Sequence, residues 1–368
     1  MPHFADIDHA ARLASLRAQL PTENGCDTVL LLDLVDVRWL TGFTGSNGWA
    51  VLRADDLVLG TDGRYRDRAA AETAASGATV VAETDRAKLH QRLVDALRPA
   101  TRVALDPGTT DHARWAALQT DVSLVPTDSL IRRQRQVKDA AEVERIAAAA
   151  QAADAALAEV EPLLRATIDA PVTEADVRDE LEYRMRRHGA DDRSYDTIVA
   201  SGPDHAARPH HEVSRRRIVD GDTVVIDVGA LVDGYHSDMT RSYVIGEPTS
   251  HQREVYELVD TAQRAGLDAV HPGVSARSVD AACRDLFTDA GYGDWYLHGT
   301  GHGVGLEIHE NPYPSRVSDE ILVEGNVVTV EPGLYRGGFG GIRIEDLVHV
   351  TAVGPRVFTH HPKQPFAG

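Results

Sequence analysis

Two aspartates occupy positions in a predicted β-hairpin where their side chains converge on one face. Asp227 follows an apolar run, and Asp238 lies beyond the dipeptide Asp233-Gly234, which is a strong signal for a tight turn between strands. With this dipeptide at the turn, Asp227 pairs with Thr240, and Asp238 is two residues away on the same face. Carboxylates held this close raise each other's pKa unless a cation neutralises them. The pattern indicates either a divalent cation site or a hairpin with two solvent-facing aspartates.

Three later motifs place single ionisable residues in similar apolar surroundings. These residues are His302 in the glycine-rich stretch HGTGHGVGLEIHE, Glu331 in TVEPG and Glu345 in GIRIEDL. A buried, unpaired carboxylate is too costly to be incidental. Together with the two aspartates, these residues make a set of four carboxylates and one imidazole, which are ligand types that divalent ions prefer. Four negative charges balance two such ions, which suits a two-metal hydrolytic site.

The composition limits the class of protein. The chain has 368 residues, 42% of them hydrophobic and 26% charged, which predicts one or two globular domains. A formal net charge of -19 argues against nucleic acid and anionic membranes as partners. The two cysteines, Cys26 and Cys283, give no disulfide framework, and we find neither a signal-like N-terminus nor an apolar run of membrane-spanning length. We therefore expect a cytoplasmic protein without membrane or nucleic-acid partners.

Residues 1–128 alternate between helical and strand-like patterns. Helices are expected at 10–20 and 62–73, a buried strand at 28–34, and a hairpin within 48–60. None of the candidate ligands lies in this region. We therefore expect one α/β domain that supports the site without contributing ligands to it.

The candidate ligands all lie in residues 129–368. A basic cluster at 131–138 opens this region, and we interpret it as a solvated helix face or a domain-packing surface. Thr173 and Asp176 have the spacing of a capping box at the start of a helix. Helices are expected at 140–157, 173–188, 252–265 and 278–290, and the chain from residue 295 onward is rich in strands. Outer helices around a curved antiparallel sheet make an α+β architecture.

The five candidate ligands, in their order and spacing, resemble those of the pita-bread metallopeptidases. They are Asp227, Asp238, His302, Glu331 and Glu345. That family includes methionine aminopeptidase, aminopeptidase P and prolidase, with creatinase as a relative. The first 130 residues resemble the N-terminal domain shared by creatinase, prolidase and aminopeptidase P. The resemblance implies a creatinase-like α/β domain at 1–128 followed by a pita-bread catalytic domain at 129–368.

The resemblance also implies a role for each ligand. Asp227 would chelate one metal ion, Asp238 and Glu345 would bridge both ions, and His302 and Glu331 would complete the second. Glu331 would also serve as the general base that accepts a proton from water. The implied cofactor is a pair of divalent ions, with Mn²⁺ preferred and Co²⁺ or Zn²⁺ as alternatives. Next to these ligands, Thr240 and Arg241 resemble the supporting residues that metal sites need.

Several other residues resemble groups that contact the substrate in this family. His210 in ARPHHEVS and His309 match active-site histidines, and His298 and Arg343 match substrate-binding residues. The competing interpretation is a satisfied core histidine or, for Arg343, an ordinary salt bridge. The remaining histidines that we considered are expected to be structural. They are His205, His211, His360 and His361.

The resemblance predicts an exopeptidase that cleaves the bond before proline in peptides with proline at the second position. We prefer an Xaa-Pro aminopeptidase, because the loops at 41–48 and 61–66 resemble those of aminopeptidase P proteins. The alternative is an Xaa-Pro dipeptidase (prolidase). A non-catalytic pita-bread binding protein is a more remote alternative, since such proteins usually lose ligands and all five are intact here. We also expect a homodimer, the commonest oligomeric state of soluble proteins.

Overall fold

The computed structural model describes residues 4–22, 25–128, 130–165 and 171–365. The chain forms two compact units, one of Asp6–Arg135 and one of Gln136–Gly368 together with Met1–Ala5. No helix in the described part of the chain is long and apolar enough to cross a membrane.

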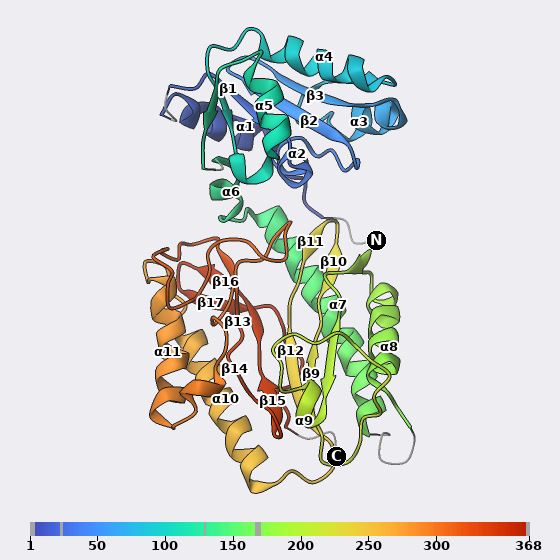
Figure 1. The fold of residues 1–368 in the computed structure, drawn as a ribbon, viewed down its shortest axis with the longest axis vertical. Coiled ribbons are helices and arrows are strands. Elements are labelled where there is room, and N and C mark those ends of the chain that lie inside the picture. Colours follow the sequence, from blue (N-terminus) through green and yellow to red (C-terminus); the bar gives the residue numbers. More distant parts are fainter. Residues whose placement is uncertain (1–3, 23–24, 129, 166–170, 366–368) are drawn as a thin grey trace. The chain divides into compact units, whose positions relative to one another are not determined.

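The unit Asp6–Arg135 is an α/β domain built on a six-stranded mixed sheet (Figure 1). The strand order is β4-β3-β2-β1-β5-β6, with β2 antiparallel to both of its neighbours and the remaining pairs parallel. The strands are β1 (Thr28–Leu31), β2 (Gly48–Arg53), β3 (Leu57–Asp62), β4 (Thr79–Glu83), β5 (Val103–Leu105) and β6 (Leu124–Pro126). The helices are α1 (His9–Gln19), α2 (Leu34–Thr41), α3 (Arg66–Glu72), α4 (Arg86–Leu97), α5 (His112–Gln119) and α6 (Leu130–Arg135).

The predicted hairpin of this unit is present, whereas the predicted strand at 28–34 is shorter. In the hairpin, Gly48 pairs with Thr61. The strand ends at Leu31 because Asp33 caps a helix, α2, by accepting a hydrogen bond from the backbone N–H of Val35. An apolar run of this length suits a buried strand and the start of a buried helix equally well.

The larger unit combines outer helices with antiparallel strands, as the α+β prediction requires. Its helices are α7 (Ala140–Arg165), α8 (Glu174–Arg187), α9 (Gly202–His205), α10 (Ser250–Asp268) and α11 (Ala276–Asp289). Its strands are β7 (Asp192–Arg193), β8 (Ile198–Ser201), β9 (Thr223–Asp227), β10 (Ala230–Val232), β11 (Tyr235–His236), β12 (Thr240–Val244), β13 (Val327–Val330), β14 (Gly333–Arg336), β15 (Gly340–Arg343), β16 (Asp346–Thr351) and β17 (Gly354–Val357). They form the sheets β12-β9-β8, β13-β16-β17, β11-β10-β7 and β14-β15.

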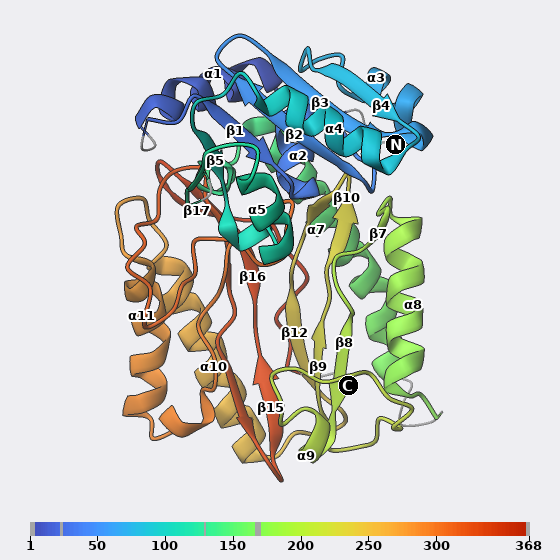
Figure 2. The same cartoon turned by 45° about the horizontal axis from the view of Figure 1, so that its top comes forward.

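The larger unit has two halves, one from α7 to β12 and one from α10 to β17. In each half, two helices cover the strands (Figure 2). Side chains of α7 and α8, such as Leu157 and Leu181, share one core with Ile226 of β9. Side chains of α10 and α11, such as Phe287, share another core with Ile342 of β15. Burial of these apolar faces is the dominant favourable term that fixes the strands in place.

Local signals in the sequence set the ends of these elements. The capping box predicted at the start of α8 is present, because Thr173 and Asp176 exchange side-chain and backbone hydrogen bonds. The pairing of Asp227 with Thr240 is also as predicted. The segments around Asp233-Gly234, however, pair in a different sheet from β9 and β12, so the hairpin is divided between two sheets.

Several hydrogen bonds join the halves of the larger unit, and two of them come from backbone N–H groups after β15 and at its end. The backbone N–H of Glu345 donates to the carbonyl of Thr240 at 3.1 Å, and the backbone N–H of Arg343 donates to Oγ of Ser242 at 2.9 Å. The segment between β15 and β16 therefore lies along β12. This arrangement brings strand ends from both halves of the larger unit close together.

Candidate active site

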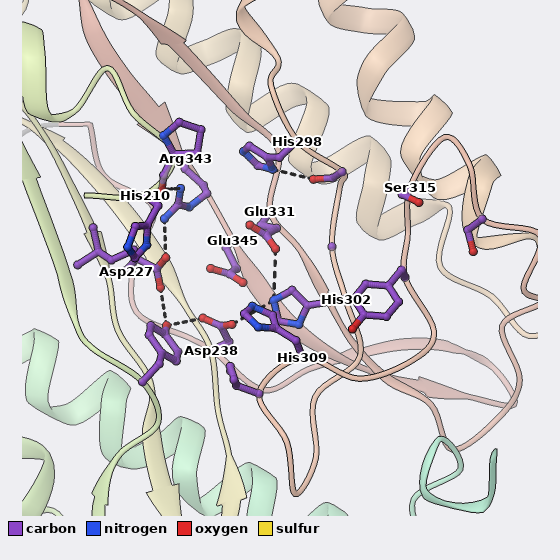
Figure 3. A pocket seen from close by; sticks show the side chains of 18 of the residues that line it. His210, Asp227, Asp238, His298, His302, His309, Ser315, Glu331, Arg343 and Glu345 are labelled. Atoms are coloured by element: carbon purple, nitrogen blue, oxygen red, sulfur yellow. Dashed lines mark hydrogen bonds and ion pairs between the residues drawn. The ribbon is translucent and has the colours of Figure 1, made fainter. Parts of the chain in front are cut away.

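All nine residues singled out from the sequence line one cavity of about 940 Å³. Figure 3 shows them around a common space. They are His210, Asp227, Asp238, His298, His302, His309, Glu331, Arg343 and Glu345.

The acidic members and Arg343 lie at or near strand ends. Asp227 is the last residue of β9, Glu331 follows β13 directly, and Glu345 lies between β15 and β16. Asp238 lies in the connection between β11 and β12, and Arg343 is the last residue of β15. The apolar residues directly before Asp227, Glu331, Arg343 and Glu345 are held in the core. The charged side chain that follows is thereby placed at the cavity without freedom to turn into solvent.

His302 lies between two carboxylates (Figure 3). Its Nε2 is 3.4 Å from Oδ2 of Asp238 and 3.4 Å from Oε1 of Glu331. Its Nδ1 lies 3.0 Å from the carbonyl oxygen of Gly303. Because that oxygen can only accept a hydrogen bond, Nδ1 carries a proton. Nε2 faces the carboxylates, and a metal ion can bind to it in place of a second proton.

Burial and mutual repulsion raise the pKa of three carboxyl groups, those of Glu345, Glu331 and Asp227. For Glu345, burial and then the charges of Asp238 and Glu331 raise the pKa well above its ordinary range. Burial raises the pKa of Glu331 to about 7, although His302 and Arg343 oppose the shift. Burial also raises the pKa of Asp227, against the charge of Arg343. The site without a cation is therefore short of positive charge.

The raised pKa of His302 shows the same shortage of positive charge. Burial alone lowers the pKa of an imidazole, but the hydrogen bond to Asp238 and the charge of Glu331 outweigh it and raise the pKa of His302 to about 9. The carboxylates thus attract a proton to the position where a metal ion would bind.

These residues fit a metal site. Asp238, His302 and Glu345 present ligand atoms that all lie within 4.8 Å of one another. Oε1 of Glu345 is buried without a hydrogen-bond partner, which is costly unless a cation or water satisfies it. Together with Asp227 and Glu331, these side chains would hold divalent ions. When bound, such ions polarise a carbonyl group and lower the pKa of water.

Supporting residues hold the candidate ligands in position. Oγ1 of Thr240 donates to Oε2 of Glu345 at 2.7 Å, and Oγ1 of Thr329 donates to Oε1 of Glu331 at 3.2 Å. The buried guanidinium of Arg241 donates to the carbonyl oxygen of Glu345. Thr240 and Arg241, both expected from the sequence to support the site, therefore contact a ligand residue directly.

Arg343 is engaged on several sides. Its Nη2 donates to Asp227, its Nη1 donates to the hydroxyl of Tyr335 at 2.8 Å and to the carbonyl of Pro209 at 2.9 Å, and its Nε donates to Oγ1 of Thr240 at 3.0 Å. Four of its five N–H groups are thus bound within the described part of the chain. This geometry orients Asp227 and leaves Arg343 one N–H for a substrate.

The three remaining histidines lie in different surroundings. His298 contacts the hydroxyl of Tyr335 through Nε2 at 3.0 Å, and burial lowers its pKa to about 4. The ring of His309 stands edge-on to that of His302 at 4.4 Å, and burial lowers its pKa. His210 is exposed in the cavity.

Two tyrosines belong to this site although no motif in the sequence selects them. Tyr195 lines the cavity, and its hydroxyl lies within hydrogen-bond distance of both Asp227 and Asp238, to one of which its single O–H donates. Tyr335 contacts Arg343 and His298. The contacts of Tyr195 are with residues at least 30 positions away, and Tyr335 contacts Arg343 across a strand pair. Neither tyrosine interrupts an apolar pattern.

The histidines expected to be structural are not among the residues that line the cavity. His205 and His211 contact Glu174, and His361 contacts Tyr243. The backbone N–H of His360 donates to Asp154.

An imidazole and four carboxylates around a cavity, with one carboxylate oxygen unsatisfied, define a metal-dependent hydrolytic centre on an α+β scaffold. Comparison with protein families identifies the scaffold. Residues 144–352 match metallopeptidase family M24, and residues 12–137 match the creatinase/prolidase N-terminal domain. The chain therefore belongs to metallopeptidase family M24, whose members depend on a dinuclear metal centre. The pita-bread fold and the metallopeptidase class predicted from the sequence are confirmed.

Relatives come from the prolidase and aminopeptidase P branch of this family. An Xaa-Pro dipeptidase from Pyrococcus furiosus is 42% identical over 233 residues, which cover 63% of this chain and 65% of the relative. The structure of an Xaa-Pro dipeptidase from Bacillus anthracis has a TM-score of 0.92 and 34% identity, covering 97% of this chain and 99% of that one. The structure of an X-Pro aminopeptidase from Thermotoga maritima has a TM-score of 0.84 and 33% identity, covering 93% and 97%.

Proposed function

We propose that this chain is an Xaa-Pro dipeptidase, which hydrolyses the bond between the first residue and the proline of a dipeptide. The observation that carries the hydrolytic part of this proposal is the convergence of Asp227, Asp238, His302, Glu331 and Glu345 on one cavity. Similarity to the Bacillus anthracis dipeptidase over nearly the whole of both chains supports the substrate class.

The side chains around the cavity have different roles in the reaction. The five ligand-type residues hold two divalent ions, with Mn²⁺ preferred over Co²⁺ and Zn²⁺. Glu331 accepts a proton from the attacking water, because it is a carboxylate at the centre of the site. His210 and His309 contact the substrate beside the cleaved bond. His298 and the remaining N–H of Arg343 bind and orient the substrate.

The second candidate is an Xaa-Pro aminopeptidase, which our sequence analysis preferred. The structural similarity to the Thermotoga maritima X-Pro aminopeptidase supports it, as do the loops at 41–48 and 61–66. The relatives support the dipeptidase better, and for that reason we place it first. Proline itself favours a dedicated enzyme, because its imide bond lacks an N–H and restricts the chain.

The deciding experiment compares a dipeptide with a tripeptide. Release of alanine from Ala-Pro and from Ala-Pro-Ala is followed at matched concentrations with Mn²⁺, and Pro-Ala serves as the substrate control. We expect a rate on Ala-Pro at least equal to the rate on Ala-Pro-Ala, and no release from Pro-Ala. A faster reaction with the tripeptide would overturn the dipeptidase assignment in favour of the aminopeptidase.

A further inference from the structure

Glu174, the first residue of α8, is a buried carboxylate outside the residues that line the cavity. It is 0% exposed and accepts six hydrogen bonds. Oε1 accepts from the backbone N–H and Oγ of Ser201 at 2.9 and 2.7 Å, and from Nδ1 of His205 at 2.9 Å. Oε2 accepts from the backbone N–H and Oγ of Ser214 at 3.1 and 2.7 Å, and from Nε2 of His211 at 3.2 Å.

These donors enclose the loop that carries His210. Ser201 ends β8 and Ser214 lies 13 residues later, so a single carboxylate binds the residues at both ends of the loop 202–213, in addition to the pairing of Ser201 with β9 and the hydrogen bond from Ala175 to the carbonyl of Ser214. Apart from the short helix α9, this loop contains no helix or strand, and residues 206–213 are turns, bends and irregular backbone. Without a ladder of backbone hydrogen bonds, side-chain contacts are what set the position of this stretch.

Both neighbours of His210 are anchored. On one side, the carbonyl of Pro209 accepts a hydrogen bond from Arg343, which also holds Asp227. On the other side, the ring of His211 donates to Glu174 and stacks on the ring of His205, with 4.1 Å between ring centroids. His210 itself is exposed in the cavity. Its direction therefore depends on the two anchors that flank it.

The carboxylate at this position must be ionised to accept all six hydrogen bonds. Burial raises its pKa, but the hydrogen bonds from Ser214, His205 and Ser201 outweigh that effect and lower the pKa of Glu174 to about 2. A glutamine has the same shape, but its NH₂ group cannot accept a hydrogen bond. In a Glu174→Gln variant, the NH₂ group of the glutamine would therefore face three hydrogen-bond donors without being able to accept from them.

Glu174, His205 and His211 also have the composition of a metal site. The hydrogen bonds argue against this use. Each oxygen of Glu174 already accepts three of them, and on each oxygen one comes from a backbone N–H that cannot turn away. An ion would have to displace these donors. The observations favour an anchor made of hydrogen bonds.

We propose that Glu174 is a positioning residue that holds the loop 202–213 so that His210 points into the active site. The proposal rests on the proposed function for its effect on catalysis, whereas its effect on the loop does not depend on the substrate. Misplacement of a contacting group by about 1 Å can reduce a rate about 100-fold. Loss of the anchor should therefore reduce turnover without removing the metal ions.

The test compares Glu174→Gln with a matched control at the same helix end. Asp176→Asn disrupts the capping box of α8 but leaves the loop contacts of Glu174 in place. We expect Glu174→Gln to lower kcat/KM on the Xaa-Pro substrate between about 10- and 100-fold at unchanged metal content. It should also increase hydrogen–deuterium exchange in residues 202–213. Asp176→Asn should change neither quantity by more than about twofold.

A double-mutant cycle separates positioning from general destabilisation. If Glu174 acts through His210, Glu174→Gln combined with His210→Asn should be within about twofold of His210→Asn alone. Independent effects that multiply would overturn the proposal. So would unchanged exchange in the loop, or loss of a third metal ion in Glu174→Gln, which would make this cluster a metal site instead.

Two further outcomes keep the test decisive. If Glu174→Gln does not fold, Ser214→Ala removes one hydroxyl donor from the same carboxylate and should lower kcat/KM about threefold to tenfold, with increased exchange confined to the loop. If the wild-type protein with Mn²⁺ cleaves no Xaa-Pro peptide, the proposed function fails. The exchange measurement then still decides whether Glu174 anchors the loop.

Discussion

Removal of the metal ions should make the stability of this protein fall as the pH rises. Glu331 has a pKa of about 7 in the folded protein without metal, against an ordinary value of 4.5. Between these values the folded state holds a proton that the unfolded state has released. The contribution of Glu331 to stability is therefore complete at and below pH 4.5 and is lost as the pH rises towards 7, whereas the buried His298, with its pKa lowered to about 4, contributes in the opposite direction up to pH 6.5. His302 acts in the same direction as Glu331 between 6.5 and 9, because its pKa is raised to about 9.

The size of the effect follows from the pKa of Glu331. A rise from 4.5 to about 7 corresponds to about 3 kcal/mol of lost stability, at 1.36 kcal/mol per pKa unit. A domain of roughly 230 residues changes its melting temperature by about 2–4 °C per kcal/mol, which gives a fall of about 6–12 °C. Bound divalent ions take the place of the proton, so the metal-loaded protein should not show this decline.

Thermal unfolding of the chelator-treated protein at several values between pH 5 and pH 8 tests the prediction. Glu331→Gln cannot titrate, so its melting temperature should fall less with rising pH than that of the wild type, whereas the exposed Glu247→Gln should behave like the wild type. A melting temperature of the metal-free wild type that stays constant or rises between pH 6.5 and pH 8 would refute the reasoning. An equal decline in Glu331→Gln would refute the assignment to that residue.

Two further predictions concern a buried ion pair and the oligomeric state. Arg343→Met leaves the carboxylate of Asp227 without its buried partner, and we expect a loss of about 3–5 kcal/mol in the free energy of unfolding of the metal-free protein by urea denaturation. A loss below about 1 kcal/mol would show that Arg343 does not compensate this charge. Light scattering should give a mass of about twice the 39.9 kDa of the chain, as expected for a homodimer, and a monomer mass would contradict it.

Three of the candidate ligands, Asp227, Glu331 and Glu345, stand out in the sequence because each one breaks a local apolar pattern. Asp227 and Glu331 end runs that are buried in strands, and the turn at Asp233-Gly234 was sufficient to pair Asp227 with Thr240. These are short-range signals, and tertiary contacts only bring together positions that the pattern has already marked.

Buried ion pairs could not be predicted in the same way. We interpreted the basic cluster 131–138 as a solvated face or a packing surface, but Arg135 and Lys138 are both buried. Arg135 pairs with Asp36, 99 residues away, and Lys138 pairs with Glu310, 172 residues away. A charged residue near a helix end looks the same in the sequence whether its partner is water or a distant carboxylate.

The contacts of Glu174 were hidden for a related reason. The sequence predicts that Thr173 and Asp176 cap α8, and a glutamate in the first turn of a helix is ordinary. Its burial depends on where the loop 202–213 runs. The sequence of that loop predicts neither a helix nor a strand over most of its length.

We expect peptidase activity to depend on two metal ions held by five side chains. Metal content and Ala-Pro hydrolysis should be measured together while Mn²⁺ is added back to chelator-treated protein, for the wild type and for Asp238→Asn. We predict that the wild type regains activity and saturates at two ions per chain, and that Asp238→Asn loses bound metal and activity together. Full activity in metal-free wild-type protein would contradict the account.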